Sequence, residues 1–206
     1  KETQAAAWAC LCGIVAKRHN APVSMRLDRQ DDMVVTGKRH EFANRYEVGL
    51  DKSGRILGVD MQLAGLCGYA PDLSDAIVDR AMFHCDNAYY YPAARVAGHR
   101  CKTHTVSNMA YRGFGGPQGL MTAEYMMDHI AYTLGQDPLQ VRLANLYQDG
   151  QSTHYGQTIE HFDLANIMTK LAADCDYDKR RQQIIEFNQK AAAEGSDKRL
   201  GLALTP

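Results

Sequence analysis

Apolar and polar side chains alternate along several short segments of the chain, and this pattern predicts strands. Residues 45–50 and 55–63 alternate most regularly, and the turn-forming run Asp-Lys-Ser-Gly at 51–54 lies between them. We therefore predict a β-hairpin there. Weaker alternation predicts two further strands, at residues 22–27 and 93–105.

Other segments space their apolar side chains as one face of a helix does. The predicted helices cover residues 2–17, 28–33 (a short helix or a turn), 73–82, 120–134, 137–146 and most of 163–194. Asp137 and Pro138 suit the N-cap and the first position of a helix. Loops are expected at 65–71, 89–92 and 148–157, and 200–206 is expected to open another strand.

The order of these elements indicates the fold class. Hairpins and helices are mixed without a regular β-α-β alternation, which favours an α+β fold of mixed sheets with hairpins packed against helices. The 23 basic and 24 acidic side chains leave no positive field for nucleic acid or anionic lipid. Since no apolar run approaches the roughly 20 residues of a membrane span, we expect neither a nucleic-acid nor a membrane partner.

Six cysteines are scattered along the chain without any Cys-x-x-Cys pair. Cys10 and Cys12 are two residues apart, so on a helix their side chains would point away from each other. Such spacing suits neither a metal site nor a disulfide framework. We therefore expect reduced, buried thiols that behave as small apolar residues in a cytoplasmic protein.

Residues 112–119 (Arg-Gly-Phe-Gly-Gly-Pro-Gln-Gly) form the most informative segment. Three glycines around one aromatic residue lead into a helix that begins with proline, so this backbone can approach a cofactor or phosphate closely. The alternative is a tight turn in which glycine only relieves strain. A Walker A loop is excluded because no Lys-Ser/Thr follows the glycines, and the spacing does not match a dinucleotide fingerprint.

This segment resembles the Arg-Gly-Phe-Gly-Gly-Pro-Gln-Gly signature of the molybdenum hydroxylases, the xanthine oxidase and aldehyde oxidase family. Further segments resemble the family in the same order along the chain: residues 27–33, 79–87, 141–147 and 153–157. The opening Lys1-Glu2-Thr3 is similar to a family tripeptide that follows another glycine-rich loop. With neither an initiator Met nor a signal peptide at the start, this predicts a fragment of a larger catalytic subunit.

The resemblance implies that the chain is part of the molybdenum cofactor-binding domain. Residues 1–149 would belong to a first molybdopterin-binding subdomain, and residues 150–206 would begin a second. The cofactor would be molybdenum-molybdopterin, with the metal held by the pterin dithiolene, so no protein metal ligand is expected. The residues expected to contact the cofactor are Arg112, Gly113, Phe114 and Gly115.

Two positions distinguish substrates within this family. Its purine-oxidising members, the xanthine dehydrogenases, carry a glutamate at the position of Glu2 and an arginine at that of Arg80. The resemblance therefore implies hydroxylation of hypoxanthine and xanthine to urate, in which Arg80 would stabilise negative charge developing on the purine carbonyl oxygen. Glu2 would orient the purine and share a proton, although by itself it also suits a helix start. Phe114 would place an aromatic face against the purine.

The other candidate residues also have plain structural interpretations. Without the resemblance, Arg80 fits better as an exposed arginine at a helix end, paired with Asp75 or Asp79. Phe114 could simply fill space between the glycines, and Arg112 could be a solvated charge in a turn. The resemblance shifts all of these residues towards a functional role.

The resemblance also implies parts that this chain lacks. The catalytic base, a glutamate, and the 2Fe-2S clusters and FAD that carry electrons away would lie in other segments, domains or subunits of an oligomeric enzyme. We therefore expect the isolated chain to be inactive and to bind the cofactor weakly or not at all. His84 is interpreted as a core or supporting residue rather than a metal ligand. Two alternatives remain: a relative that oxidises an aldehyde or another heterocycle, and a non-catalytic anion-binding module.

Overall fold

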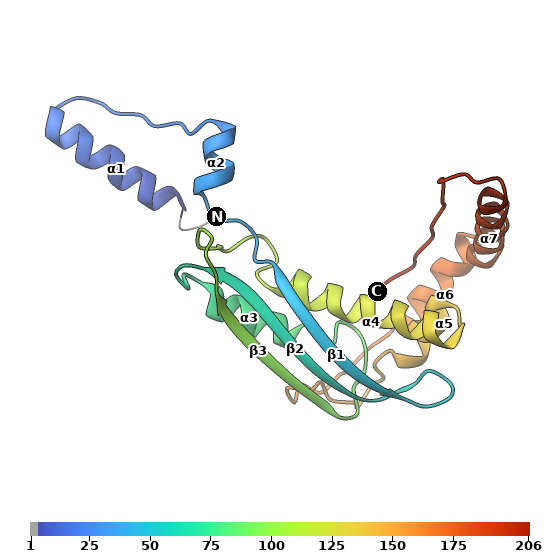
Figure 1. Ribbon diagram of the computed structural model, residues 1–206. Coiled ribbons are helices and arrows are strands. Elements are labelled where there is room, and N and C mark those ends of the chain that lie inside the picture. The colour runs from blue at the N-terminus through green and yellow to red at the C-terminus, as the bar shows by residue number, and fades with distance from the viewer. Residues whose placement is uncertain (1–3) are drawn as a thin grey trace. The chain divides into compact units, whose positions relative to one another are not determined.

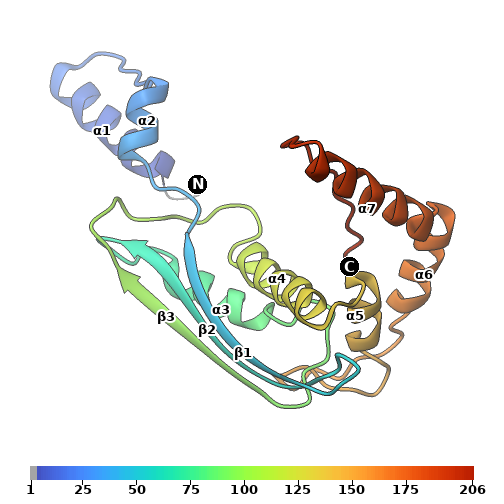
Figure 2. The same cartoon turned by 45° about the vertical axis from the view of Figure 1, so that its right-hand side comes forward.

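The structure is a computed structural model and describes residues 4–206. Within these residues the chain forms seven helices and three strands (Figures 1 and 2). In chain order they are α1 (Gln4–His19), α2 (Arg29–Val35), β1 (Phe42–Leu50), β2 (Ile56–Gly68), α3 (Ser74–Phe83), β3 (Ala94–Lys102), α4 (Gly116–Leu134), α5 (Pro138–Asn145), α6 (Leu164–Asp174) and α7 (Tyr177–Ala193). This mixture confirms the α+β fold class.

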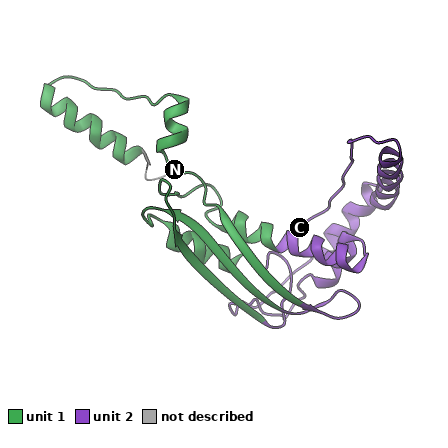
Figure 3. Cartoon of the chain, in the orientation of Figure 1, with its two compact units in different colours: residues 1–48, 59–85, 94–122 green, residues 49–58, 86–93, 123–206 purple. Residues whose placement is uncertain are grey.

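The chain divides into two compact units that interleave in sequence (Figure 3). The described residues of unit 1 are 4–48, 59–85 and 94–122, and unit 2 contains 49–58, 86–93 and 123–206. These units follow contacts within the chain and do not test the expected subdomain boundary between residues 149 and 150. That boundary stays a prediction.

The predicted hairpin is present and longer than expected. β1 and β2 are neighbours in a three-stranded sheet of order β1-β2-β3, and residues 51–55 connect them. The carboxylate of Asp51 accepts hydrogen bonds from the backbone amides of Ser53 and Arg55, at 2.8 and 3.0 Å. The Ser53 hydroxyl also donates to this carboxylate at 2.6 Å, and it is the main cause, ahead of the backbone amides, of the lowered pKa of Asp51. A single acidic side chain therefore closes the turn that the sequence predicts.

The third strand pairs in a way that the sequence pattern did not reveal. β2 and β3 are parallel, from the pair Val59 and Ala94 to the pair Gly68 and Lys102, and α3 connects them. Figures 1 and 2 show α3 lying along the sheet. Gly98 of β3 lies under α3, where a Cβ would overlap Met82. The bare glycine allows the helix to approach the strand closely.

Three strand or loop predictions are wrong. Residues 22–27 and 200–206 form no strand, because neither segment has a neighbouring strand to pair with in the described part of the chain. The loop expected at 65–71 begins only after Gly68, because β2 continues to that residue. Alternation of side chains alone does not form a strand without a partner for its backbone groups.

The helix predictions are confirmed within residues 4–206, while the expected start at residue 2 lies outside the described residues. Two predicted helix ends have the expected chemistry. Asp28 caps α2 by accepting from the amide of Asp31, and Asp137 caps α5 by accepting from Leu139, both at 2.8 Å. The long helix expected at 163–194 is broken into α6 and α7 at Asp176, whose φ of 52° is left-handed. The segment 148–157 is irregular, as expected.

All six cysteines are free, as expected for reduced thiols. Cys67 and Cys85 are buried, but Cys10 is exposed and the other three are half-buried, so the expectation of uniformly buried thiols is wrong. Cys10 lies on α1, where most side chains are exposed in this chain. None of the described helices combines the length and apolar character needed to cross a membrane.

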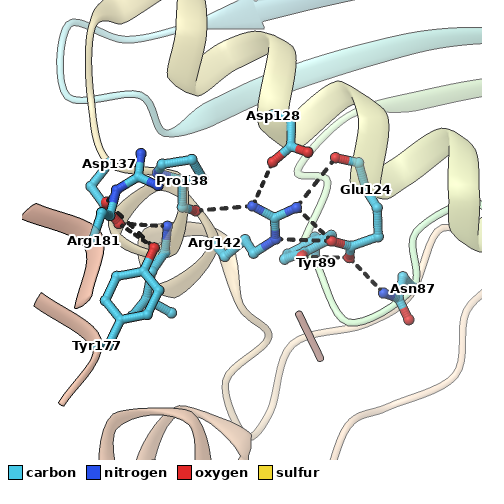
Figure 4. Close-up of polar contacts among 10 residues, drawn as sticks. Asn87, Tyr89, Glu124, Asp128, Asp137, Pro138, Arg142, Tyr177 and Arg181 are labelled. Carbon is cyan, nitrogen blue, oxygen red and sulfur yellow. Dashed lines mark hydrogen bonds and ion pairs between the residues drawn. The ribbon is translucent and has the colours of Figure 1, made fainter. Parts of the chain in front are cut away.

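The interior of unit 2 contains a buried arginine, Arg142 of α5, which is 2% exposed (Figure 4). Its guanidinium makes ion pairs of 2.8 Å with Glu124 and with Asp128 of α4. Burial opposes the charge, but the hydrogen bonds to Asp128 and Glu124 outweigh it and raise the pKa of Arg142. The Tyr89 hydroxyl donates to Glu124 at 2.6 Å. Burial is the main cause that raises the pKa of this hydroxyl, and the Glu124 carboxylate is the second. The network fixes α5 against α4 within unit 2.

Candidate cofactor and substrate site

The glycine loop in unit 1 adopts a backbone that few residues tolerate. Gly113, Phe114 and Gly115 all have positive φ, of 93°, 49° and 95°. Glycine adopts this region freely, whereas a side chain at Phe114 makes it strained. Short hydrogen bonds hold the turn, from the Phe114 amide to the Tyr111 carbonyl at 2.8 Å and from the Gly116 amide to the Gly113 carbonyl at 2.9 Å.

Two glycines let this loop and the start of α4 pack closely against α3. A Cβ on Gly115 would overlap the carbonyl oxygen of Ile77, and a Cβ on Gly119 would overlap that of Ala81. The glycines therefore let the loop touch the helix backbone directly. This contact puts the loop beside the last turn of α3, which carries Arg80.

Arg80 lies in that last turn, and its side chain is exposed. Its two acidic neighbours on α3 are occupied by another arginine: Arg100 of β3 pairs with Asp75 at 3.3 Å and also with Asp79. Within residues 4–206, neither carboxylate makes an ion pair with Arg80. The structural alternative of an arginine paired with Asp75 or Asp79 is therefore wrong, because the parallel strand β3 brings Arg100 to them instead.

The other expected site residues differ in exposure. Phe114 is half-buried, and Arg112 is exposed with its carbonyl facing the guanidinium of Arg39. Glu2 lies outside the described residues. Arg80, Arg112 and Phe114 thus belong to one unit, on the loop and on the helix that contacts it.

A second segment, residues 38–40, supports the loop from one side. The amide of Met109 donates to the carbonyl of Lys38 at 3.0 Å, so the two segments run together. Nε2 of Gln118 donates to the carbonyl of His40, also at 3.0 Å. Arg39 donates from Nη2 to the carbonyl of Arg112 at 2.7 Å. These contacts hold the glycine loop and the first turn of α4.

His40 joins this supporting segment to α3. Its Nε2 and the hydroxyl of Ser74, the first residue of α3, share a hydrogen bond of 2.7 Å, and both side chains are buried. Burial lowers the pKa of His40, opposed by the Met109 backbone and by the negative charge of Asp72. The imidazole is therefore held neutral inside unit 1.

Besides Nδ1 of His40, two polar atoms around the loop are buried and have no hydrogen-bond partner in residues 4–206. They are Nη1 of Arg39, a donor, and Oε1 of Gln118, an acceptor. Folded proteins rarely leave such atoms unpaired. An open donor and an open acceptor beside a glycine backbone fit a ligand with both kinds of polar group, as a pterin with a phosphate has. In the same residues, no group of three His, Cys, Asp or Glu side chains could hold a metal ion.

The sequence identified the loop and Arg80 but missed the residues that hold them. Arg39 is 73 residues before Arg112, and His40 is 78 residues before Gln118, the residues to which they hydrogen-bond. Their own surroundings in the sequence carry no motif. Gln118 stands out in the sequence only as part of the signature. A buried atom without a partner is visible only in three dimensions.

A family model described as a molybdopterin cofactor-binding domain matches residues 1–146. This match covers well over half of the sequence. The chain therefore belongs to the molybdopterin cofactor-binding domain family, which confirms the resemblance and the expected cofactor.

Curated relatives carry a narrower name. Xanthine dehydrogenase/oxidase of Mus musculus is 39% identical over 206 residues, and xanthine dehydrogenase 1 of Arabidopsis thaliana is 38% identical over the same length. Both alignments cover 100% of this chain but only 15% of the relative. The chain is thus similar throughout to one segment of these much longer proteins.

Solved structures of molybdenum hydroxylases share the fold. Aldehyde oxidoreductase from Desulfovibrio desulfuricans matches with a TM-score of 0.77 and 26% identity, over 85% of this chain and 19% of that chain. CO dehydrogenase from Oligotropha carboxidovorans matches with a TM-score of 0.76 over 90% of this chain and 24% of that chain. At 19% identity, the second match shows the fold alone.

Proposed function

We propose that the chain is part of the molybdopterin-binding catalytic region of a xanthine dehydrogenase, which hydroxylates hypoxanthine and xanthine to urate. The observation that carries this proposal is the 36–39% identity to xanthine dehydrogenases of animals and plants, over 190 residues or more. The presence of Glu2 and Arg80, the two residues expected of purine-oxidising members, supports the same substrate.

Arg80 acts on the charge of the transition state. Attack on an electron-poor ring carbon spreads negative charge over the purine towards its carbonyl oxygen, and a guanidinium there stabilises the transition state more than the ground state. The exposure of Arg80 and the engagement of Asp75 and Asp79 by Arg100 support this role, because they leave the guanidinium available to a substrate.

Glu2 and Phe114 orient the substrate. Glu2 accepts hydrogen bonds from the purine ring nitrogens and shares a proton with them. Phe114 offers an aromatic face to the flat ring, a contact worth about 1 kcal/mol. Its strained backbone supports a functional role, because such strain persists mainly where the surrounding structure requires it.

The backbone of the glycine loop and Arg112 hold the cofactor. The chemistry that a bound molybdenum-molybdopterin supplies is the oxidation of a ring C–H carbon to a hydroxylated carbon. Gly113 and Gly115 let the loop backbone pack tightly against Pro117 and Ile77, which fixes the loop that meets the cofactor. Arg112 adds a positive charge near the cofactor.

The remaining parts of the enzyme follow from the same proposal. The 2Fe-2S clusters and FAD lie on other domains or subunits, the whole enzyme is a cytoplasmic oligomer, and residues 150–206 begin a second molybdopterin-binding subdomain. The isolated chain is inactive. The six free cysteines are consistent with a cytoplasmic location.

Substitution of Arg80 in the full-length protein that contains this chain tests the proposal. We expect Arg80→Met to lower kcat/KM for xanthine by about 100- to 1,000-fold, the loss typical of one charge-stabilising donor. Glu2→Val should also reduce purine turnover strongly. The matched control is Arg95→Met, because Arg95 is an exposed arginine of the same unit that pairs with Asp60.

Molybdenum content is measured alongside turnover, so that loss of cofactor is not mistaken for loss of catalysis. The main alternative is an aldehyde-oxidising relative, which the likeness to two Desulfovibrio aldehyde oxidoreductases at 26% and 29% identity favours. That alternative predicts efficient aldehyde turnover that Arg80→Met barely changes. A protein with no molybdenum or pterin would leave only the non-catalytic anion-binding module.

A further inference from the structure

One guanidinium connects the supporting segment to the glycine loop. Arg39 donates from Nη2 to the carbonyl of Arg112 at 2.7 Å, and its Cζ atom lies 4.3 Å from the centroid of the Tyr111 ring. The carbonyl and the aromatic face fix the orientation of the guanidinium. Arg39 is therefore held in place before any ligand binds.

The other terminal nitrogen of this guanidinium is unpaired within residues 4–206. Nη1 of Arg39 is buried and has no hydrogen-bond partner there. It lies 3.9 Å from the position that a Cβ on Gly113 would take. The ring of Pro117 occupies that position, so the donor lies beside the point where Gly113 packs against the first turn of α4.

The charge of Arg39 is also uncompensated in the described residues. Among residues 4–206 no carboxylate makes an ion pair with it, although Arg95, Arg100, Arg142 and Arg181 all have acidic partners. A half-buried cation with an unpaired donor favours an anionic acceptor. A guanidinium matches the geometry of phosphate oxygens particularly well.

We propose that Arg39 is a cofactor-binding residue that donates Nη1–H to a phosphate oxygen of the molybdopterin cofactor, while Nη2–H holds the glycine loop through the Arg112 carbonyl. This inference rests on the proposed function. It explains why a buried donor is left open at this loop, and it assigns the cofactor an anchor from a segment more than 70 residues before the signature.

The test uses the full-length protein loaded with its cofactor, in three versions besides the unsubstituted one. Arg39→Gln removes the charge. Arg39→Lys keeps the charge, but an ammonium group cannot bridge two acceptors as the planar guanidinium does. Arg95→Lys is the matched control on an exposed arginine. The first measurement is the rate at which molybdenum and pterin leave the protein during dialysis. We expect Arg39→Gln to lose them about 10- to 100-fold faster than the unsubstituted protein, Arg39→Lys to be intermediate, and the control to be unchanged.

A second measurement separates contact with the cofactor from mere support of the loop. Bound cofactor raises the unfolding temperature in proportion to its affinity, so the gap between loaded and cofactor-free protein should shrink in both Arg39 variants. Support of the loop alone would lower both temperatures equally and leave the gap unchanged, and that result overturns the inference. If Arg39→Gln does not fold, Arg39→Lys carries the same test. An unsubstituted protein without molybdenum and pterin would overturn the proposed function itself, and this inference with it.

Discussion

His40 is a buried imidazole whose environment makes the stability of the protein depend on pH. Burial lowers its pKa below the ordinary value of 6.5, so the folded state binds a proton less readily than the unfolded state. In the window below pH 6.5 and above the folded pKa, the unfolded state therefore carries more protons. Stability rises with pH wherever that holds, and it falls as the pH is lowered through this window.

We expect acidification from pH 7.5 to 5.5 to destabilise the unsubstituted protein more than a His40→Gln variant. One proton changes the free energy of unfolding by at most about 1.4 kcal/mol per pH unit. The measurement is the urea midpoint at both pH values. His99→Gln, at an exposed histidine of the same unit, is the control and should retain the full pH dependence. An equal acid effect in His40→Gln and in the unsubstituted protein would contradict the assignment.

The sequence could identify Arg80, Arg112 and Phe114 only through their resemblance to a family motif. It could not reveal the partners of the residues around them. Asp75 and Asp79 share helix α3 with Arg80, and Asp79 directly precedes it, but both pair with Arg100. Arg100 follows them by more than 20 residues and reaches them through a parallel strand. The spacing of residues along the sequence cannot reveal such a pairing, because the pairing depends on the path of the chain in space.

At the scale of elements, the contact between the glycine loop and α3 determines how the candidate site is built. Gly115 lies directly on the backbone of α3, which leaves no room for a side chain. The helix and the loop therefore move together, and Arg80 and Phe114 keep a fixed relation to each other. This contact is the physical reason why glycine is required at that position.

Gly115→Ala should destabilise the protein by roughly 3 kcal/mol or more, because it adds a clash with the Ile77 carbonyl to the strain of positive φ. Gly156→Ala is the matched control: its φ of 89° is similar to the 95° of Gly115, but no atom lies within 4 Å of the added Cβ. The control substitution should lower the free energy of unfolding by only about 1–2 kcal/mol. Chemical denaturation measures the free energy of unfolding of both variants. An equal loss in the two variants would mean that the close contact between Gly115 and α3 is absent.

Elements with strong local signals were predictable, and those that depend on distant partners were not. The hairpin has regular alternation and a turn closed by Asp51, and α5 has an acidic cap followed by proline. In contrast, residues 22–27 alternate as a strand does but lack a neighbouring strand. The parallel pairing of β2 with β3 also escaped prediction, because the intervening α3 gives no sign of which strand will lie beside which.

At the scale of the whole molecule, the stability of unit 2 depends on the charge network around Arg142. The guanidinium is almost fully buried between two carboxylates, and Asn145 of the same helix donates to the Gly54 carbonyl at 2.9 Å. The network therefore connects α5, α4 and the hairpin turn inside one unit. Removing its central charge would break the hydrogen bonds to the half-buried Glu124 and the exposed Asp128.

We expect Arg142→Met to lower the free energy of unfolding by about 1.5–3 kcal/mol, because hydrogen bonds to two charged carboxylates are lost. Lys170→Met is the control in the same unit, because Lys170 makes an exposed pair with Asp174 that contributes little. Thermal and chemical denaturation give both values. A loss below 1 kcal/mol in Arg142→Met would mean that Glu124 and Asp128 are solvated rather than held by the arginine.

The most direct test of the central claim is a crystal structure of the cofactor-loaded, full-length protein with a purine bound. We expect the Arg80 guanidinium to lie within hydrogen-bond distance of a purine carbonyl oxygen, about 2.7–3.2 Å. We also expect the Phe114 ring against the purine and Glu2 beside the ring nitrogens. A purine bound elsewhere, with these three side chains on unrelated surfaces of an intact fold, would contradict the central claim.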